Sequence, residues 1–233
     1  AARYKDDERV FAWDILNEPS IRPNEAFWAE WAKIAEPKGW PLHYSEQRGT
    51  VPSGEAGAAF QQLCYKHTNR WLERMTAAVR TGGNTTLVTV GFLQQIFPLT
   101  SFCGFHPAWA ARNHDFLSYH YYPGMIDMSI QYRRALDRGT LTAAYLAGFG
   151  KAVFNGEFSW VGGNNDLVQL GGSTFLPSSE EQCAVWNRDL VTATRPYACG
   201  WLNWGMFDIP EARDCTAYSG MCAADGREKA WGA

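Results

Sequence analysis

Five short apolar or aromatic runs recur along the chain, and helical or long connecting segments separate each run from the next. The runs cover residues 10–16, 85–92, 116–122, 151–160 and 200–208. Short strands joined by crossover helices are typical of a parallel sheet with helices packed on it. The sequence therefore predicts an α/β fold. Because 233 residues suffice for one sizeable core, we expect a single domain over 1–233.

Helical patterns and breakers fill the intervals between the runs. Asn24 is placed to cap the first helix, and Ser178 with Glu181 predicts a capping box at the start of the last one. Gly, Pro and Asn interrupt two intervals that we expect to be loops, at 37–54 and 161–177. The expected helices cover about 24–36, 55–80, 124–146 and 178–194.

Polar or aromatic side chains stand near the C-terminal ends of four of these runs. They are Asn17, Glu18, His120, Tyr122, Glu157 and Trp204. In parallel α/β folds the C-terminal ends of the strands form the active face. One glutamate at a strand end is ordinary, but two glutamates with His, Tyr and Trp at the same level predict a catalytic constellation.

Cleavage of a glycosidic bond is the chemistry that needs two carboxyl groups. One must be protonated to give its proton to the leaving oxygen, and the other must be ionised to attack the anomeric carbon or activate water. Their surroundings must therefore push the two pKa values apart. A hydrogen bond from a tyrosine hydroxyl would hold Glu157 ionised.

Composition excludes several other classes of function. The net charge of −3 is scattered, whereas nucleic-acid binding needs a concentrated basic face. No apolar run approaches the roughly 20 residues of a membrane helix, and the charged start is no signal peptide. The six cysteines form no CxxC pair and have no histidine at metal-ligand spacing, so we expect no metal and no cofactor.

The even number of cysteines permits disulfides and favours a secreted or extracellular protein. Cys215 and Cys222 could close a small loop. Cys64 and Cys183 fall on helical patterns, where buried free thiols are an equally good interpretation.

Four motifs occur in a fixed order along the chain: WDILNEP, SYHYYP, VFNGEFSW and GWLNWGMFD. This ordered set resembles strands four, six, seven and eight of glycoside hydrolases of clan A, particularly the cellulase and mannanase relatives of family 5. VTVGF resembles strand five, and DGREKAWG resembles the stretch before the last helix. The similarity spans nearly the whole chain, and the ordered set is far more specific than Asn-Glu-Pro alone.

The resemblance implies roles for individual residues. Glu18 matches the acid/base carboxyl and Glu157 the nucleophile, and the family retains anomeric configuration, so the carboxyls should lie roughly 5 Å apart. The residues expected to bind the sugar or support the site are Asn17 at the 2-hydroxyl, His120, Tyr122 in contact with the nucleophile, Trp204 as an aromatic platform, and Trp160, which could line the cleft or pack in the core. Trp201, out of phase with Trp204, should face the helices.

The place of Glu18 near the start of the chain departs from the family pattern. A strand-helix-strand unit takes about 30 residues or more, so three strands cannot precede this one. The chain therefore resembles strands four to eight of a (β/α)8 TIM barrel, a partial barrel of about five βα units. The Arg and His that the family supplies from its first and third strands have no counterpart here. We expect the open barrel to be covered by self-association, by a second polypeptide, or by an unfamiliar closure of the sheet.

Three interpretations of function follow from these residues. The first is a retaining hydrolase of β-1,4-linked glucan or mannan, with activity weakened by the halved barrel. The second is a carbohydrate-binding partial barrel without turnover. The third is an inert fragment of a longer glycosidase.

Overall fold

The computed structural model describes residues 1–44, 53–81, 83, 85–93, 104–123, 132–164, 166, 168–170, 173–175 and 177–230. Five strands form one parallel sheet in which every strand lies beside its neighbour in the sequence. Its strands, in spatial order, are β1 (Ala12–Asn17), β2 (Leu87–Phe92), β3 (Phe116–Tyr121), β4 (Ala152–Phe158) and β7 (Gly200–Asn203). This arrangement confirms the predicted α/β class and fits a partial barrel.

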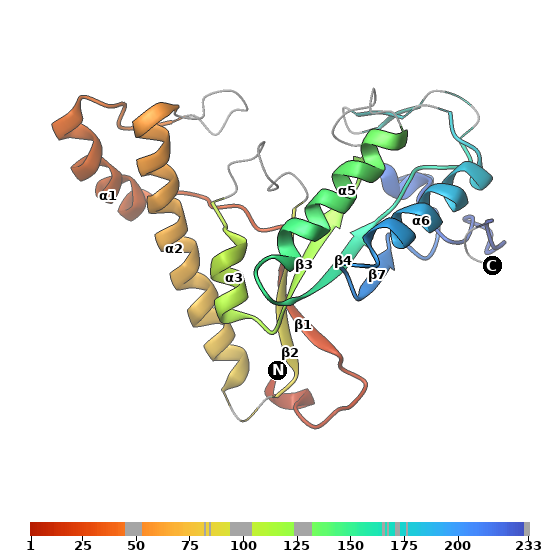
Figure 1. Cartoon of the computed structure of the whole chain (residues 1–233), viewed down its shortest axis with the longest axis horizontal. Coiled ribbons are helices and arrows are strands. Elements are labelled where there is room, and N and C mark those ends of the chain that lie inside the picture. The colour runs from red at the N-terminus through yellow and green to blue at the C-terminus, as the bar shows by residue number, and fades with distance from the viewer. Residues whose placement is uncertain are drawn as a thin grey trace.

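Helices connect these strands and cover one side of the sheet (Figure 1). In that view α1 and α2 lie with α3 at the β1–β2 end, while α5 and α6 lie together at the β4–β7 end. Within the described residues, no helix combines the length and apolar character needed to cross a membrane. The helices are α1 (Glu25–Ala35), α2 (Gly54–Arg80), α3 (Pro107–Asn113), α5 (Tyr132–Ala147) and α6 (Glu180–Thr194), with 3-10 turns η1 (Ala2–Tyr4), η2 (Glu36–Lys38) and η4 (Cys215–Ala217).

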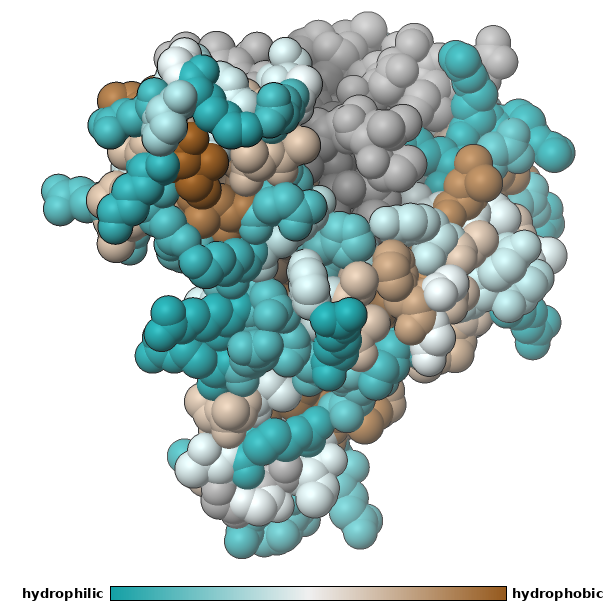
Figure 2. All heavy atoms as spheres, turned by 60° about the vertical axis from the view of Figure 1, so that its left-hand side comes forward, coloured by the Kyte–Doolittle hydropathy of each residue, from teal (hydrophilic) through white to brown (hydrophobic). Residues whose placement is uncertain are grey.

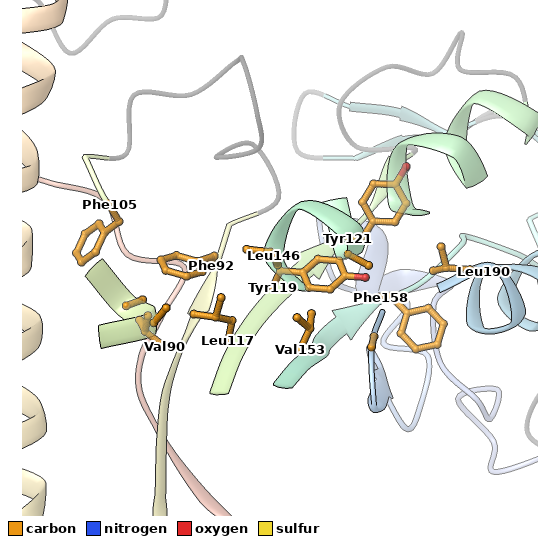
Figure 3. Close-up of a cluster of buried hydrophobic side chains, with 14 of the residues drawn as sticks. Val90, Phe92, Phe105, Leu117, Tyr119, Tyr121, Leu146, Val153, Phe158 and Leu190 are labelled. Atoms are coloured by element: carbon orange, nitrogen blue, oxygen red, sulfur yellow. The ribbon is translucent and has the colours of Figure 1, made fainter. Parts of the chain in front are cut away.

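The main core lies between this outer side of the sheet and the helices (Figure 3). Alternate strand residues supply it, because successive side chains of a strand point to opposite faces. They include Val90, Phe92, Leu117, Tyr119 and Val153, which pack with Leu146 of α5 and Leu190 of α6. Phe158 joins them because the register of β4 shifts after Asn155. Burying each such apolar side chain contributes about 1.5–3 kcal/mol. Trp201 also faces this side and donates from Nε1 to Thr194 Oγ1, as its spacing from Trp204 predicts.

The opposite side of the sheet, here called the inner face, carries Gly91, Phe116, His120, Phe154 and Leu202. Near the start of the strands, the ring of Phe11 lies 5.9 Å from that of Phe116 and 6.1 Å from that of Phe154. Phe11 remains 63% exposed and Leu202 56% exposed. The inner face is therefore open to solvent in this chain, as expected for a sheet that does not close into a barrel. The face seen in Figure 2 is by contrast largely hydrophilic, with small separate hydrophobic patches.

Helix caps match the sequence at one end of the chain and differ by one residue at the other. Asn24 caps α1 as predicted, since its side chain accepts from Phe27 N–H. The predicted Ser178–Glu181 box is wrong, because Ser179 and Gln182 form the capping box of α6. The run SSEEQ offers both pairs, and Ser178 Oγ instead accepts from Trp160 Nε1 at 3.2 Å.

Connecting segments differ more from expectation. The interval 161–177, predicted as a loop, contains a two-stranded antiparallel ladder of β5 (Val168–Leu170) and β6 (Ser173–Phe175). The last strand leaves the sheet after Asn203 rather than at residue 208. The middle of the predicted 37–54 loop, at 45–52, and the first part of the predicted 124–146 helix, at 124–131, lie outside the described residues.

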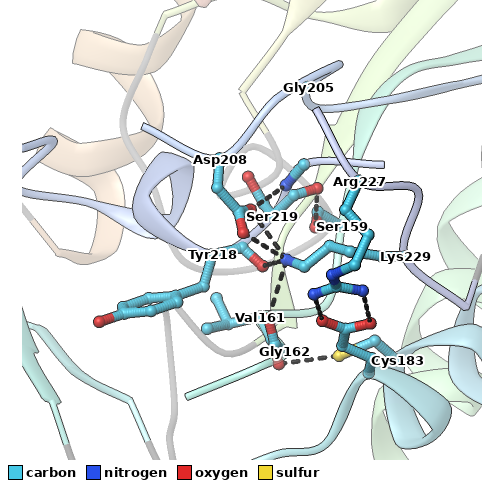
Figure 4. A network of polar contacts seen from close by, with 12 residues as sticks. Ser159, Val161, Gly162, Cys183, Gly205, Asp208, Tyr218, Ser219, Arg227 and Lys229 are labelled. Carbon is cyan, nitrogen blue, oxygen red and sulfur yellow. Dashed lines mark hydrogen bonds and ion pairs between the residues drawn. The ribbon is translucent and has the colours of Figure 1, made fainter. Parts of the chain in front are cut away.

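A buried ion pair holds the segment after β7 in place (Figure 4). Lys229 is 2% exposed, and its Nζ donates to Asp208 Oδ1 at 2.8 Å. The same ammonium donates to the carbonyls of Gly162 and Tyr218. These bonds tie the C-terminal segment to the loop after β4, so the two loops above the strand ends are fixed relative to each other.

The cysteines of the described residues form no disulfide bonds. Cys215 and Cys222 are both free, so the small disulfide loop considered from the sequence is not formed. Cys64 and Cys183 are buried thiols, and burial raises the pKa of each to about 12. Cys103 lies outside the described residues.

Candidate active site

Glu18 emerges from an irregularity at the end of β1. The pairing of β1 with β2 shifts register between Asp14 and Asn17. Beyond the shift, Glu18 N–H donates to the carbonyl of Gly91 at 2.9 Å. Glu18 has a φ of 45°, in the left-handed region that costs a non-glycine residue about 1–3 kcal/mol. The fold therefore holds this carboxylate in a conformation that the sequence alone would not select.

His120 joins the two glutamates of the site. Its side chain is 2% exposed on the inner face. Nδ1 lies 2.8 Å from Glu18 Oε1 and 3.3 Å from Glu157 Oε2. Because an ionised carboxylate can only accept hydrogen bonds, Nδ1 donates to this pair. The imidazole thus links residues that lie 139 positions apart in the chain.

Glu157 sits on β4 with a tyrosine hydroxyl against it. Tyr122 donates to Glu157 Oε2 at 2.7 Å, the contact that the resemblance implies. Burial raises the pKa of Glu157, while the hydrogen bond from Tyr122 and the charge of His120 lower it. The nearby carboxylates of Glu18 and Asp14 raise it further. The expected tyrosine contact exists, but desolvation outweighs its effect on the pKa.

The two carboxyl groups face one space. One oxygen of Glu18, one oxygen of Glu157 and a ring nitrogen of His120 all lie within 4.8 Å of one another. Three such groups could also ligate a cation. His120 Nδ1–H already donates hydrogen bonds to the two carboxylates, so a cation bound at Nδ1 would have to displace that proton.

Asn17 and Trp204 stand at the ends of the two outermost strands of the sheet, β1 and β7. Asn17 is the exposed last residue of β1. Trp204 follows β7, is 42% exposed, and donates from Nε1 to Thr216 Oγ1 at 3.1 Å. Its exposed ring is available for stacking, and its role as a sugar platform stays a prediction.

Trp160 lies apart from the carboxylates. Its ring packs 5.1 Å from that of Trp186 and 6.4 Å from that of Tyr132, against the helix-side core. The structure therefore does not bring Trp160 to the glutamate cluster, and a part in sugar binding stays a prediction. The core alternative for this residue accounts for its described contacts.

Sequence reasoning overlooked two residues beside the cluster. Asp14 places a carboxylate within an apolar strand, which is itself an unusual signal. Cys215 is buried against Tyr122 and Val161, and burial raises the pKa of its thiol to about 12. No sequence signal pointed to Cys215, since it comes from η4, nearly a hundred residues after Tyr122.

Comparison with known families gives this geometry a context. The sequence profile described as Cellulase (glycosyl hydrolase family 5) matches residues 1–208. The chain belongs to glycosyl hydrolase family 5. The resemblance drawn from the four motifs is thereby confirmed. A search of curated protein sequences finds no match.

The chain is similar in fold to parts of larger solved structures. It is similar to a β-galactosidase from the psychrophilic Marinomonas ef1, with a TM-score of 0.65 and 15% identity over 97% of this chain and 38% of that one. A Ruminococcus gnavus β-glucuronidase gives a TM-score of 0.58 and 15% identity over 98% of this chain and 31% of that one. A glycoside hydrolase family 17 β-1,3-glucanosyltransferase from Rhizomucor miehei gives 0.51 and 17%, over 91% of this chain and 73% of that one. The chain thus spans 38% of the first of these structures.

Proposed function

We propose that this family 5 protein hydrolyses β-linked glycans, β-1,4-glucan or mannan, with retention of anomeric configuration. The proposal rests mainly on one observation. Glu18 and Glu157 both contact Nδ1 of His120, and one oxygen of each carboxyl lies within 4.8 Å of the other. Retaining enzymes keep their carboxyls about 5–5.5 Å apart, while inverting ones need about 6.5–9.5 Å to admit a water.

In the proposed reaction Glu157 is the nucleophile. Its carboxylate attacks the anomeric carbon while Glu18, as the acid, protonates the leaving glycosidic oxygen. Glu18 then takes a proton from water, which attacks the same carbon and releases Glu157. Tyr122 and His120 hold the nucleophile through the hydrogen bonds described above.

Binding of the sugar is assigned to groups around this space. Asn17 would hydrogen-bond the 2-hydroxyl at the cleavage point, and the exposed face of Trp204 would stack under the ring. No cofactor enters this mechanism, because both proton transfer and nucleophilic attack come from side chains of the chain itself.

The open inner face also belongs to the proposal. Exposed apolar side chains such as Phe11 and Leu202 favour a covered state of this surface. We propose that a second copy of the chain covers it in the active form; strands supplied by another polypeptide are the alternative. Completion of the barrel would also surround the carboxyl groups and exclude water from them.

A second candidate is carbohydrate binding without turnover. It is favoured by the same open face, because a sheet open to solvent positions a substrate less closely, and misplacement by about 1 Å can cost about a hundredfold in rate. Reducing-sugar release from β-glucans, mannans and xylans, paired with binding by calorimetry, separates the two. Binding without release would favour the second candidate.

The hydrolase proposal is tested by Glu18→Gln and Glu157→Gln. Each should lower kcat on a glycan by about 10²- to 10⁴-fold. On a dinitrophenyl glycoside, whose leaving group needs no proton, Glu18→Gln should recover most of its glycosylation rate, while Glu157→Gln should not. Exposed Glu211→Gln is the matched control and should act like the unmodified protein. Unchanged rates in both active-site variants would exclude the assignment.

A further inference from the structure

Asp14 binds the backbone at the irregularity from which Glu18 emerges. Its Oδ1 accepts from Gly91 N–H at 3.0 Å and from Leu16 N–H at 3.3 Å. The carbonyl of the same Gly91 accepts from Glu18 N–H at 2.9 Å. Both backbone groups of Gly91 therefore bind β1, one through the Asp14 side chain and the other through the backbone of Glu18. The carboxylate thus binds backbone N–H groups of both strands at the register shift that precedes Glu18.

The second oxygen of Asp14 faces the far edge of the His120 ring. A β-carbon added to Gly91 would lie 2.7 Å from Asp14 Oδ2 and 2.6 Å from His120 Nε2. The carboxylate and the ring nitrogen therefore face each other across the space of a single methyl group, which only glycine leaves free. Nδ1, on the opposite edge of the ring, is taken by Glu18 and Glu157.

We propose that Asp14 is a positioning residue of this site, which fixes the turn into Glu18 and holds the Nε2 edge of His120 through the gap left by Gly91. The kinetic part of this inference rests on the proposed hydrolase function. The structural part concerns only the arrangement of Asp14, Gly91 and His120. Asp14 touches neither carboxyl in the described contacts and acts through its neighbours.

The charge of Asp14 also acts on the groups of the site. The carboxylate of Asp14 contributes to the raised pKa of Glu157. Burial raises the pKa of Asp14 itself, although the residue keeps exposed surface on the inner face, and its hydrogen bonds and the charge of His120 lower it. The titratable groups around Glu157, from every described element packed there, are Asp14, Glu18, His120, Tyr122 and Cys215.

The test uses Asp14→Asn, which keeps an acceptor for Gly91 N–H but removes the charge, and Asp14→Ala, which removes both. Because the charge raises the pKa of Glu157, its loss should lower that pKa. The acid limb of kcat/KM should then move to lower pH in Asp14→Asn. Asp14→Ala should lose about ten- to a hundredfold in kcat, with KM little changed, since Glu18 is then misaimed.

Asp115→Asn is the matched control. Asp115 also accepts a backbone N–H of β2, from Val88 at 2.7 Å, and pairs with Arg80, but at the opposite end of the strand. Loss of the Asp115 carboxylate should lower thermal stability and leave the pH dependence of kcat/KM unchanged. Gly91→Ala is a second variant, which keeps the charge and inserts a methyl group between Asp14 and His120. It should lose activity to a similar extent as Asp14→Ala.

A readout without substrate separates this inference from the proposed function. Carbon-13 NMR of the Glu157 carboxyl should show a lower titration midpoint in Asp14→Asn than in the unmodified protein or in Asp115→Asn. If no form of the protein cleaves a glycan, the proposed function fails while this titration still decides the inference. An unmoved midpoint, or a Gly91→Ala variant with the His120 ring and Glu18 undisplaced, overturns the inference.

Discussion

At the residue scale, the pKa of Glu157 is the balance of opposing influences. Burial and two neighbouring carboxylates raise it, while Tyr122 and His120 lower it. A nucleophile must be ionised, so the acid side of the activity profile should report this balance. The midpoint is expected above the ordinary glutamate value, because desolvation is the largest influence.

Tyr122→Phe removes one influence that lowers the pKa of Glu157. The pKa should therefore rise, and the acid limb of kcat/KM should move to higher pH by about one pH unit, the equivalent of a hydrogen bond to a charged group. Tyr132→Phe is the control, since Tyr132 likewise donates to a carboxylate, that of Asp189 on the helix side. An unchanged acid limb in Tyr122→Phe would show that the hydroxyl does not affect the pKa of the nucleophile. The pH dependence of kcat/KM is measured for both variants.

At the element scale, the segment after β7 depends on one buried cation. Lys229 satisfies Asp208 and two backbone carbonyls, and its side chain is almost fully enclosed. Nearby, Arg227 pairs with Glu180, but the Arg227 side chain is 58% exposed and that of Glu180 is 21% exposed, so this pair is in contact with solvent. Ion pairs in contact with solvent contribute little to stability, whereas removing one partner of a buried pair leaves the other charge buried and unpaired. The two pairs should therefore respond very differently to substitution.

Lys229→Met should lower the free energy of unfolding by about 3–5 kcal/mol, because Asp208 stays buried without its cation. Asp208→Asn combined with Lys229→Met should recover part of that loss. Arg227→Met, the control, should change stability little. Denaturant unfolding followed by fluorescence gives these values. A Lys229→Met variant as stable as Arg227→Met would mean that the network of Figure 4 does not hold this segment.

At the scale of the whole molecule, alternation of strands and helices was sufficient to predict the parallel sheet, whereas the sequential strand order was implied only by the resemblance to a TIM barrel. The site was predictable to the extent that it lies at strand ends, because parallel strands bring their C-terminal ends to one edge. Asp14 was not, since its role depends on a register shift that no periodicity encodes. The β5–β6 ladder was missed, and the choice between cleft and core for Trp160 was left open, for a related reason: both depend on partners that local pattern does not specify.

The open inner face leads to a prediction about association. Leu202 is 56% exposed there, on β7, whereas Leu141 is 70% exposed on α5, outside the barrel. If two copies bury their inner faces together, each buried leucine contributes about 1.5–3 kcal/mol. Leu202→Ser should then weaken dimerisation of the 233-residue chain by about tenfold or more, while Leu141→Ser should leave it unchanged. Sedimentation equilibrium measures both constants. A monomeric chain, or equal effects of the two substitutions, would contradict self-association through the inner face.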